Sequence, residues 1–307
     1  MIDVGAKITT LREATAEGFV SLQPQALQRL QANDTPKPDV LATARAAALL
    51  AAKKCSEIVP HCHIVPLEGV SVQFNQEPAG LRIKATASAI ARTGVEMEAL
   101  AAVQAAALVV YDMLKFLDLP MSIEGVKLLE KSGGKSDFKP HFKPGFRAAV
   151  VVASDRISAG SATDKTGPWL LDQLRGFGIQ DLGYHLLPDD EGRLRQLFID
   201  LQAQGVDLVL STGGTGLSPR DRTVEALRPV LDRELPGAME AARAYGQART
   251  PYAMLSRGLA GHRGKTLYAT LPGSMGGVQD SFTAIFPALF HAFHVLSQSP
   301  QPVAAKP

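Results

Sequence analysis

The sequence has only two cysteines, Cys55 and Cys62, in 307 residues. Two thiols cannot form the disulfide framework of a small secreted protein, and reduced thiols are typical of the cytoplasm. The first residues, MIDVGAKITTLREATAEG, are charged throughout and lack the apolar centre of a signal peptide. The most apolar stretch, LAAVQAAALVVY, is shorter than the roughly 20 residues that a bilayer span requires. We therefore expect a cytoplasmic protein without a membrane partner.

A strong excess of charge of one sign is also absent. The formal net charge is +2, which is too small to indicate a nucleic-acid partner, so any basic site must be local. The length suggests two domains of about 150 residues each. Prolines, glycines and basic residues interrupt the apolar pattern at SGGKSDFKPHFKPGFR. This boundary predicts a first domain over residues 1–138, a linker over 139–146 and a second domain over 147–307.

The two halves show different apolar patterns. In the first half, GVSVQFNQ and LRIKATASAI alternate as half-buried strands do, and residues 39–54 and 93–117 are typical of alanine-rich helices. These elements predict an α+β domain, with a ferredoxin-like sheet and helices. In the second half, the expected strands RAAVVVAS, LGYHLLP, VDLVLS and TLYATLP alternate with helices. This alternation predicts an α/β domain with a doubly wound, mostly parallel sheet.

Four loops of the second half fall at the carboxyl edge of this expected sheet, where ligands bind. They are SDRISAGSATDKTG, LPDDEG, STGGTGLSPRD and LPGS. TGGTG lacks the usual phosphate-binding lysine, but its glycines let backbone N–H groups form an anion-binding nest. Asp189 and Asp221 are candidate ligands for a magnesium ion that would neutralise nucleotide phosphates. A tight structural turn at TGGTG and an N-cap role for Asp189 are the alternatives.

The expected helix over residues 93–117 carries polar residues at both ends. Thr93 and Glu96 fit a capping box, which gives Glu96 a structural alternative. Asp112 and Lys115, at i and i+3, are neighbours and could form only a surface ion pair. Glu98 and Asp112 share a face, but at about 1.5 Å per residue they lie roughly 21 Å apart. One small site within a single chain therefore cannot use both ends.

Two other motifs of the first half suggest sites that their spacing does not support. His61 and His63, with the two cysteines, could be called a zinc site, but C-x6-C with an embedded HCH is not a standard zinc spacing. SGGKS resembles part of a Walker A loop, but the residue five before Gly134 is Leu129 rather than glycine. We expect neither site.

The second half resembles the MogA/MoaB family of molybdopterin-binding domains through the motifs SDR, DKTG, PDD, TGGTG, LSRG and LPGS. Members of that family join molybdopterin to AMP. The resemblance implies that Asp189 and Asp221 are catalytic and bind metal, and that the cofactors are Mg²⁺ and ATP. It also implies that ligands are bound by nine residues: Thr212, Gly213, Gly214, Thr215, Gly216, Ser256, Arg257, Gly273 and Ser274.

The first half resembles the MoaC family of cyclic pyranopterin monophosphate synthases through MIDVGAK, KPDVLATAR, TGVEMEAL, YDMLK and LLEKSGGKS, in that order. The resemblance implies conversion of 3′,8-cyclo-7,8-dihydro-GTP to the cyclic phosphate with loss of pyrophosphate, without a required cofactor. It implies catalytic roles for Asp112, Lys115, Lys37 and Lys131, and substrate binding by His63, Glu96 and Glu98. Because that family has its sites at subunit interfaces, we expect a homo-oligomer.

Three hypotheses follow for the whole chain. The first is a fusion of two enzymes, one forming the pterin and one activating it with a nucleotide. The second makes the first half an enzyme and the second half a pterin-binding or scaffolding module. The third is a nucleotide hydrolase in which both glycine loops serve one phosphate site, and it is the weakest because neither loop has P-loop spacing. The expected small-molecule partners are the cyclised GTP intermediate, molybdopterin and ATP.

Overall fold

The computed structural model describes residues 1–297, and within them the side chains of residues 135 and 136 are left aside. The described chain divides into two compact units, Met1–Asp137 and Phe138–Pro307. Each unit has its own hydrophobic core and is described by itself. The last ten residues of the predicted second domain lie outside the described residues.

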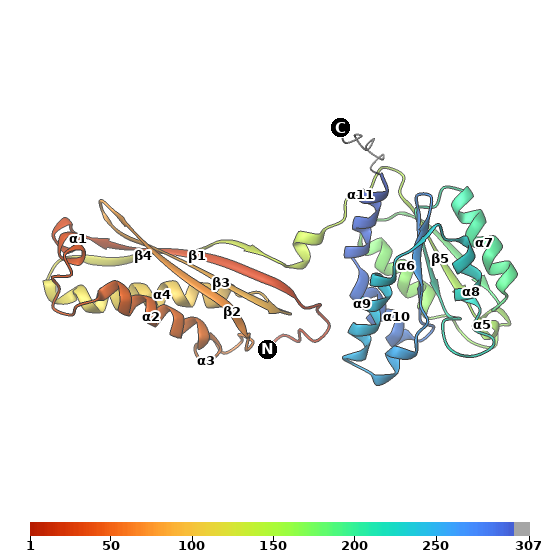
Figure 1. The fold of residues 1–307 in the computed structure, drawn as a ribbon, viewed down its shortest axis with the longest axis horizontal. Helices are drawn as coiled ribbons and strands as arrows, with labels where there is room; N and C mark the ends of the chain where they lie inside the picture. Colours follow the sequence, from red (N-terminus) through yellow and green to blue (C-terminus); the bar gives the residue numbers. More distant parts are fainter. Residues whose placement is uncertain (298–307) are drawn as a thin grey trace, which may run out of the picture. The chain divides into compact units, whose positions relative to one another are not determined.

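The first unit is a four-stranded antiparallel sheet covered by helices (Figure 1). The strands lie in the order β2-β3-β1-β4, which is the ferredoxin-like arrangement, so the predicted α+β class is confirmed. Its elements in chain order are β1 (Thr10–Leu22), α1 (Pro24–Gln31), α2 (Val40–Lys53), α3 (Cys55–Ile58), β2 (Leu67–Glu77), β3 (Gly80–Ala91), α4 (Glu96–Leu114), the 3-10 turn η1 (Lys115–Leu117), β4 (Met121–Ser132) and the 3-10 turn η2 (Lys135–Phe138).

Alternation along β3 explains how this sheet packs. Leu81 and Ile83 are fully buried, whereas Arg82 and Lys84 between them lie on the other face. The buried face contacts α4, and α4 also packs against α2. The buried residues of the two helices are mostly alanines, at positions 44, 48, 52, 99, 102, 106 and 107. Alanine side chains allow the two helix backbones to approach closely.

Helix α4, with the turn η1 that follows it, is more apolar than the sequence argument allowed. The segment Glu96–Leu117 has 22 residues, and an 18-residue window within it has a mean hydropathy of 1.6, which by length and composition is enough to cross a bilayer. The expectation that no apolar stretch is long enough to span a bilayer is therefore wrong for this segment. Its apolar pattern extends beyond the stretch LAAVQAAALVVY on which that expectation was based. In the structure its buried residues are part of the core of the first unit.

The second unit is a six-stranded sheet in the order β6-β5-β7-β10-β9-β8, with helices on both faces (Figure 1). Strands β6, β5, β7 and β10 are parallel, and β9 and β8 are antiparallel, which confirms the predicted mostly parallel α/β class. The strands are β5 (Arg147–Ala153), β6 (Asp181–Leu187), β7 (Leu208–Thr212), β8 (Arg233–Glu234), β9 (Ala260–Arg263) and β10 (Thr266–Leu271). The helices are α5 (Asp155–Ser158), α6 (Thr166–Gly176), α7 (Glu191–Ala203), α8 (Thr223–Leu227), η3 (Arg228–Val230), α9 (Pro236–Gln247), η4 (Pro251–Leu255), α10 (Met275–Ile285), η5 (Ala288–Phe290) and α11 (His291–Ser297).

This topology brings the glycine loop together with two neighbouring connections. β5, β7 and β10 are adjacent parallel strands, so the segments that follow Ala153, Thr212 and Leu271 meet at one edge of the sheet. The segment after β6 reaches the same edge, since β6 pairs with β5 in parallel. The four loops expected to carry the second site are therefore neighbours in space.

Candidate active sites

One candidate site of the first unit lies at the C-terminal end of α4. Asp112, in the last turn of the helix, accepts from Lys37 Nζ at 2.6 Å and contacts Lys115 Nζ at 2.8 Å through its other oxygen. Both ammonium groups lie over the ring of Phe116, at 5.0 and 5.4 Å from its centroid. Hydrogen bonds from Lys115 and Lys37 lower the pKa of Asp112 to about 2, so this carboxylate is ionised at physiological pH.

This arrangement is richer than the ion pair expected from spacing. Lys37 lies in the loop before α2, 75 residues away in sequence, and it shares the carboxylate with Lys115. All three side chains are between 41% and 49% exposed, so they remain accessible to a ligand. An exposed pair of ammonium groups held by one carboxylate can bind a polyphosphate without a buried charge.

The N-terminal end of α4 holds a second group of the expected residues. Glu96 Oε1 pairs with Lys131 Nζ at 3.0 Å. The Glu96 carboxylate also lies over Gly94, where an added Cβ would come within 1.9 Å of its oxygen. The predicted capping box is wrong: the N-cap is Val95, and it makes no side-chain cap. Glu96 is drawn to Lys131 on β4 instead of capping the helix.

Glu98, Cys62 and Cys55 lie together beside this group. Cys62 donates to Glu98 Oε1 at 3.4 Å, and Glu98 is only 3% exposed. Burial and the Glu98 carboxylate raise the pKa of the Cys62 thiol to about 12, and burial also raises the pKa of Cys55. Burial raises the pKa of Glu98 itself. His63, next to Cys62, makes a hydrogen bond through Nε2 to the carbonyl of Ile2 at 2.9 Å.

The expected residues of the first unit thus form two separate groups. Lys37, Asp112 and Lys115 lie at one end of α4, and the group with Glu96, Lys131, Glu98 and His63 lies at the other. Glu98 and Asp112 are fourteen residues apart on one continuous helix, which separates them by roughly 21 Å. A single unit therefore does not gather them into one cavity.

The glycine loop of the second unit depends on backbone conformations that favour glycine. Gly213 has φ +93°, and a Cβ there would lie 2.1 Å from the carbonyl oxygen of Ala153. Gly214 has φ +61°, and its Cβ would lie 2.2 Å from Thr223 Oγ1. Both residues would be strained by any side chain. The loop therefore packs its backbone directly against β5 and α8.

Three carboxylates surround this loop. Asp189 and Asp155 are joined reciprocally: the Asp155 N–H donates to Asp189 Oδ2 at 3.1 Å, and the Asp189 N–H donates to Asp155 Oδ1 at 3.0 Å. Asp189 Oδ1 would lie 3.2 Å from a Cβ on Gly214, and Asp221 Oδ2 would lie 2.9 Å from a Cβ on Gly216. Asp189 and Asp221 are thus brought to the same loop. Asp190, rather than Asp189, is the N-cap of α7 and accepts from Arg193 N–H at 2.8 Å.

The surroundings of Asp189 fit a bound cation. Its Oδ1 is buried and has no hydrogen-bond partner among the described residues. Burial raises the pKa of Asp189, and the carboxylates of Asp155 and Asp221 add to this effect. A hard divalent ion such as Mg²⁺ prefers such oxygen ligands and would satisfy the unpaired atom. Asp189 and Asp221 are therefore the residues that would hold it.

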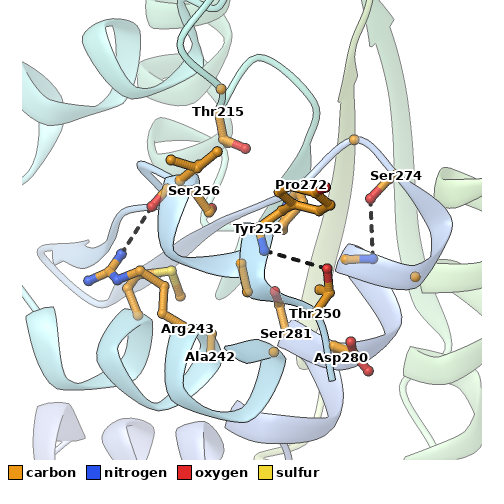
Figure 2. Close-up of a pocket in the computed structure, with 18 of the residues that line it drawn as sticks. Thr215, Ala242, Arg243, Thr250, Tyr252, Ser256, Pro272, Ser274, Asp280 and Ser281 are labelled. Carbon is orange, nitrogen blue, oxygen red and sulfur yellow. Dashed lines mark hydrogen bonds between the residues drawn. The ribbon is translucent and has the colours of Figure 1, made fainter. Parts of the chain in front are cut away.

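A cavity of about 710 Å³ opens beside the loop, a volume that suits a nucleotide-sized ligand. Figure 2 shows polar groups from several elements around it, including Thr215, Ser274 and Asp280. Of the nine residues expected to bind ligands, six line it: Gly214, Thr215, Gly216, Ser256, Gly273 and Ser274. Ser274 also caps α10 by accepting from Gly277 N–H at 3.3 Å. Thr212 and Gly213 are not among the residues that line the cavity, and Thr212 Oγ1 donates to the Pro272 carbonyl at 2.8 Å.

Arg257 contacts the glycine loop and is not among the residues that line the large cavity. Its backbone N–H donates to Thr215, its Nε to the Gly216 carbonyl at 2.6 Å, and its Nη2 to the Asp221 carbonyl at 3.0 Å. Nη1 pairs with Glu225, and hydrogen bonding from Arg257 lowers the pKa of that carboxylate. Each guanidinium nitrogen thus has a protein acceptor, so Arg257 holds the loop in shape from a neighbouring cavity of about 310 Å³.

Comparison with known proteins identifies both halves of the chain. The model of the MoaC family matches residues 1–134, and a model described as "Probable molybdopterin binding domain" matches residues 149–291. A molybdenum cofactor biosynthesis bifunctional protein of Chlorobaculum tepidum is 38% identical over 296 residues, which cover 96% of this chain and 94% of that protein. The chain belongs to the family of bifunctional molybdenum cofactor biosynthesis proteins. The bifunctional architecture predicted from sequence is therefore confirmed.

Two relatives match one half of this bifunctional protein each. A cyclic pyranopterin monophosphate synthase of Chloroflexus aggregans is 50% identical over 138 residues, covering 44% of this chain and 84% of that protein. The crystal structure of the molybdopterin biosynthesis enzyme MoaB from Thermus thermophilus is 41% identical, and covers 50% of this chain and 98% of that one, with a TM-score of 0.47. The first half of the chain is thus similar to a separate cyclic pyranopterin monophosphate synthase.

Sequence reasoning missed several residues that the structure places in the candidate sites of this bifunctional protein. Arg243, Arg249 and Thr250 line the large cavity, but they come from α9 and the segment after it, where no motif marks them. Figure 2 shows Arg243 and Thr250 at this cavity. Asp155, in the SDR motif, was not predicted to take part in the site. It follows β5, the strand next to β6, so its position in the sequence could have indicated a second carboxylate near Asp189. Cys62 donates to Glu98 from 36 residues away, and no local spacing indicates that contact.

Proposed function

We propose that the first unit converts 3′,8-cyclo-7,8-dihydro-GTP to cyclic pyranopterin monophosphate with release of pyrophosphate. The support is the 50% identity of this half to a cyclic pyranopterin monophosphate synthase, together with the group formed by Lys37, Asp112 and Lys115. One carboxylate between two accessible ammonium groups carries this proposal, since such a group can bind a triphosphate and exchange protons with its substrate.

Each residue of this group has a distinct role in the proposal. Lys37 neutralises the substrate's phosphates and favours the departure of pyrophosphate. Asp112 and Lys115 transfer protons while the purine ring opens and the pterin ring closes. Lys115 and Lys37 lower the pKa of Asp112 to about 2, so the carboxylate is ionised in the free protein and its charge holds the two ammonium groups together. Lys131 lies at the other end of α4 and contacts the substrate's phosphates or base.

We propose that the active form is an oligomer, and the separation of the two groups supports this proposal. One helix holds Glu98 and Asp112 roughly 21 Å apart, so a substrate that contacts both groups must lie between two copies of the unit. Each site would take the Asp112 end from one copy and the Glu98 end from the next. Mixing an Asp112→Asn chain with a Lys131→Ala chain tests this, because mixed oligomers regain some intact sites while either variant alone has none.

We propose that the second unit binds molybdopterin and adenylates it with Mg-ATP. In this reaction an oxygen of the molybdopterin phosphate attacks the α-phosphorus of ATP, and the bond to the β-phosphate breaks to release pyrophosphate. The unpaired, buried Oδ1 of Asp189 beside the glycine loop carries this proposal. When bound through Asp189 and Asp221, Mg²⁺ supplies charge neutralisation for the nucleotide phosphates.

The chain's own groups supply orientation. Gly214 and Gly216 line the large cavity, where their backbone N–H groups would form an anion-binding surface, and the N-terminus of α10 at Ser274 would add a second one. Arg257 keeps the loop in this conformation through the Gly216 and Asp221 carbonyls. Two anion-binding surfaces facing one cavity suit two phosphate groups brought together for reaction.

Incubating the protein with molybdopterin and Mg-ATP tests this second activity directly. The expected product is adenylated molybdopterin, and Asp221→Asn should abolish its formation while molybdopterin still binds. Asp190→Asn is the matched control: it changes the neighbouring carboxylate, which only caps α7, and asparagine caps helices as well as aspartate does. Intact binding without any adenylation in the unaltered protein would show instead a pterin-binding or scaffolding module.

A further inference from the structure

A cluster of metal-ligand side chains in the first unit lies apart from the Lys37–Asp112–Lys115 group. The sulfur atoms of Cys55 and Cys62 and a carboxylate oxygen of Glu98 all lie within 4.8 Å of one another. Thiolates and carboxylates together are a ligand set that suits zinc. We infer that Cys55, Cys62 and Glu98 bind a Zn²⁺ ion, with a fourth coordination position left to water.

The local backbone explains how two distant cysteines meet. Val59 N–H donates to the Cys55 carbonyl at 2.9 Å, and Cys62 N–H donates to the Val59 carbonyl at 2.9 Å. These bonds fold the six residues between the cysteines into two successive turns. The C-x6-C spacing, which fits no standard zinc motif, therefore becomes a pair of neighbouring thiols. Glu98, in the first turns of α4, completes the cluster from another part of the chain.

Glu98 gives independent evidence for a missing cation. Glu98 is only 3% exposed. Its Oε2 has no hydrogen-bond partner in the part of the chain that the structure describes. Leaving a buried carboxylate oxygen unpaired costs stability. Its Oε1 accepts from the Cys62 thiol, which is a weak donor. A cation at this position would satisfy the carboxylate and both sulfur atoms at once.

The distance between one sulfur and one oxygen of the cluster agrees with tetrahedral zinc. With Zn–S near 2.3 Å and Zn–O near 2.0 Å, tetrahedral angles place a sulfur and an oxygen ligand about 3.5 Å apart. Cys62 Sγ and Glu98 Oε1 are 3.4 Å apart. Cys55 is buried, but Cys62 is partly exposed, so an ion has a path from solvent. Binding releases the two thiol protons to solvent, since thiolates are the ligands.

This site differs in chemistry from the carboxylates of the second unit. Asp189 and Asp221 offer only oxygen and suit hard ions, whereas two thiolates select softer ones. The ion would connect the short helix α3 and the turn carrying His63 to the start of α4. Its role is therefore to stabilise the first unit, and this inference does not rest on either proposed activity.

Cobalt substitution in the full-length protein tests the site. Metal-free protein, kept reduced, is titrated with Co²⁺ and then with Zn²⁺. The expected result is one cobalt per chain with a thiolate-to-cobalt charge-transfer band and the strong visible bands of tetrahedral cobalt, both removed by zinc. Because the chain has only two cysteines, no other residues can produce the charge-transfer band. Absence of that band in the unaltered, folded protein would overturn the inference.

Variants then assign the ligands. Cys55→Ser or Cys62→Ser should remove the tetrahedral spectrum, and Glu98→Gln should lower cobalt affinity at least tenfold. The control is Asp189→Asn combined with Asp221→Asn, which removes the other expected metal ligands and should leave the charge-transfer band unchanged. If Glu98→Gln bound cobalt as tightly as the unaltered protein, the three-ligand site would be refuted. The cobalt spectrum of the unaltered protein decides the question even if a cysteine variant fails to fold.

Discussion

Replacing Gly213 with alanine gives the sharpest test of the glycine loop. Gly213 has φ +93°, and placing an alanine in a left-handed conformation costs about 1–2 kcal/mol. The new Cβ would also lie 2.1 Å from the backbone carbonyl oxygen of Ala153, which cannot rotate away as a side chain can. Forcing β5 and the loop apart adds about 1–3 kcal/mol. We therefore expect Gly213→Ala to destabilise the second unit by about 2–5 kcal/mol.

The single tryptophan makes this change measurable in the full chain. Trp169 is the only tryptophan, and its ring packs edge-on against Phe282 at 5.5 Å within the second unit. Tryptophan fluorescence during urea unfolding therefore reports on the second unit alone. The free energy of unfolding should fall by the stated amount, and ATP binding should weaken because the loop's N–H groups are displaced.

Gly276→Ala is the matched control for Gly213→Ala. Gly276 lines the same cavity, lies within α10, and has nothing within 4 Å of the position of a new Cβ. Because alanine favours helices more than glycine does, this change should leave stability unchanged or raise it by up to about 1 kcal/mol. Equal stability of the two variants would refute the idea that the loop requires glycine at position 213.

Three further predictions concern charged residues. Burial raises the pKa of Asp189 in the folded protein, so the contribution of this carboxyl group to stability is present at low pH and is lost as the pH rises through its folded-state pKa. Asp189→Asn should therefore raise the free energy of unfolding of the magnesium-free second unit at neutral pH, as measured by Trp169 fluorescence. A lower free energy of unfolding in this variant would contradict the argument. Asp112→Asn and Lys115→Ala should each lower cyclic pyranopterin monophosphate formation by about 100-fold or more, while light scattering shows an unchanged oligomer; retained turnover would refute their roles. Arg257→Lys should weaken nucleotide binding and lower the unfolding midpoint of the second unit, because lysine cannot hold the loop carbonyls and Glu225 together. Unchanged binding in a calorimetric titration would show that nucleotide binding does not depend on these Arg257 contacts.

The sequence predicted the second unit well because its signals are local. Each parallel strand is a short apolar run followed by a loop with glycine or aspartate, so β5, β6, β7 and β10 were found from periodicity alone. The antiparallel strands β8 and β9 were missed because they are only two and four residues long. In the first unit β1 and β4 were also missed, although both are long.

Contacts between distant residues could not be predicted in the same way. Spacing gave the Asp112–Lys115 pair, but Lys37 joins it from 75 residues away through the packing of α2 against α4. The capping-box pattern at Thr93 and Glu96 failed because α4 begins only at Glu96, and the contact of that carboxylate with Lys131 comes from 35 residues away. The length of one helix, in contrast, was enough to predict that Glu98 and Asp112 lie far apart within one chain.

The alanines between α2 and α4 have a consequence for how this protein can change. Lys37 precedes α2, and Asp112 lies in the last turn of α4. The distance between the two helices therefore sets how far the Lys37 ammonium group must reach to contact the Asp112 carboxylate. An alanine can be replaced by a smaller residue only if that residue is glycine, and replacement by any larger residue pushes the two helices apart. Substitutions at the contact between α2 and α4 should therefore occur in pairs, in which a larger residue on one helix is matched by a smaller one on the other. Such pairs would replace the contact residues and leave the separation of Lys37 and Asp112 unaltered.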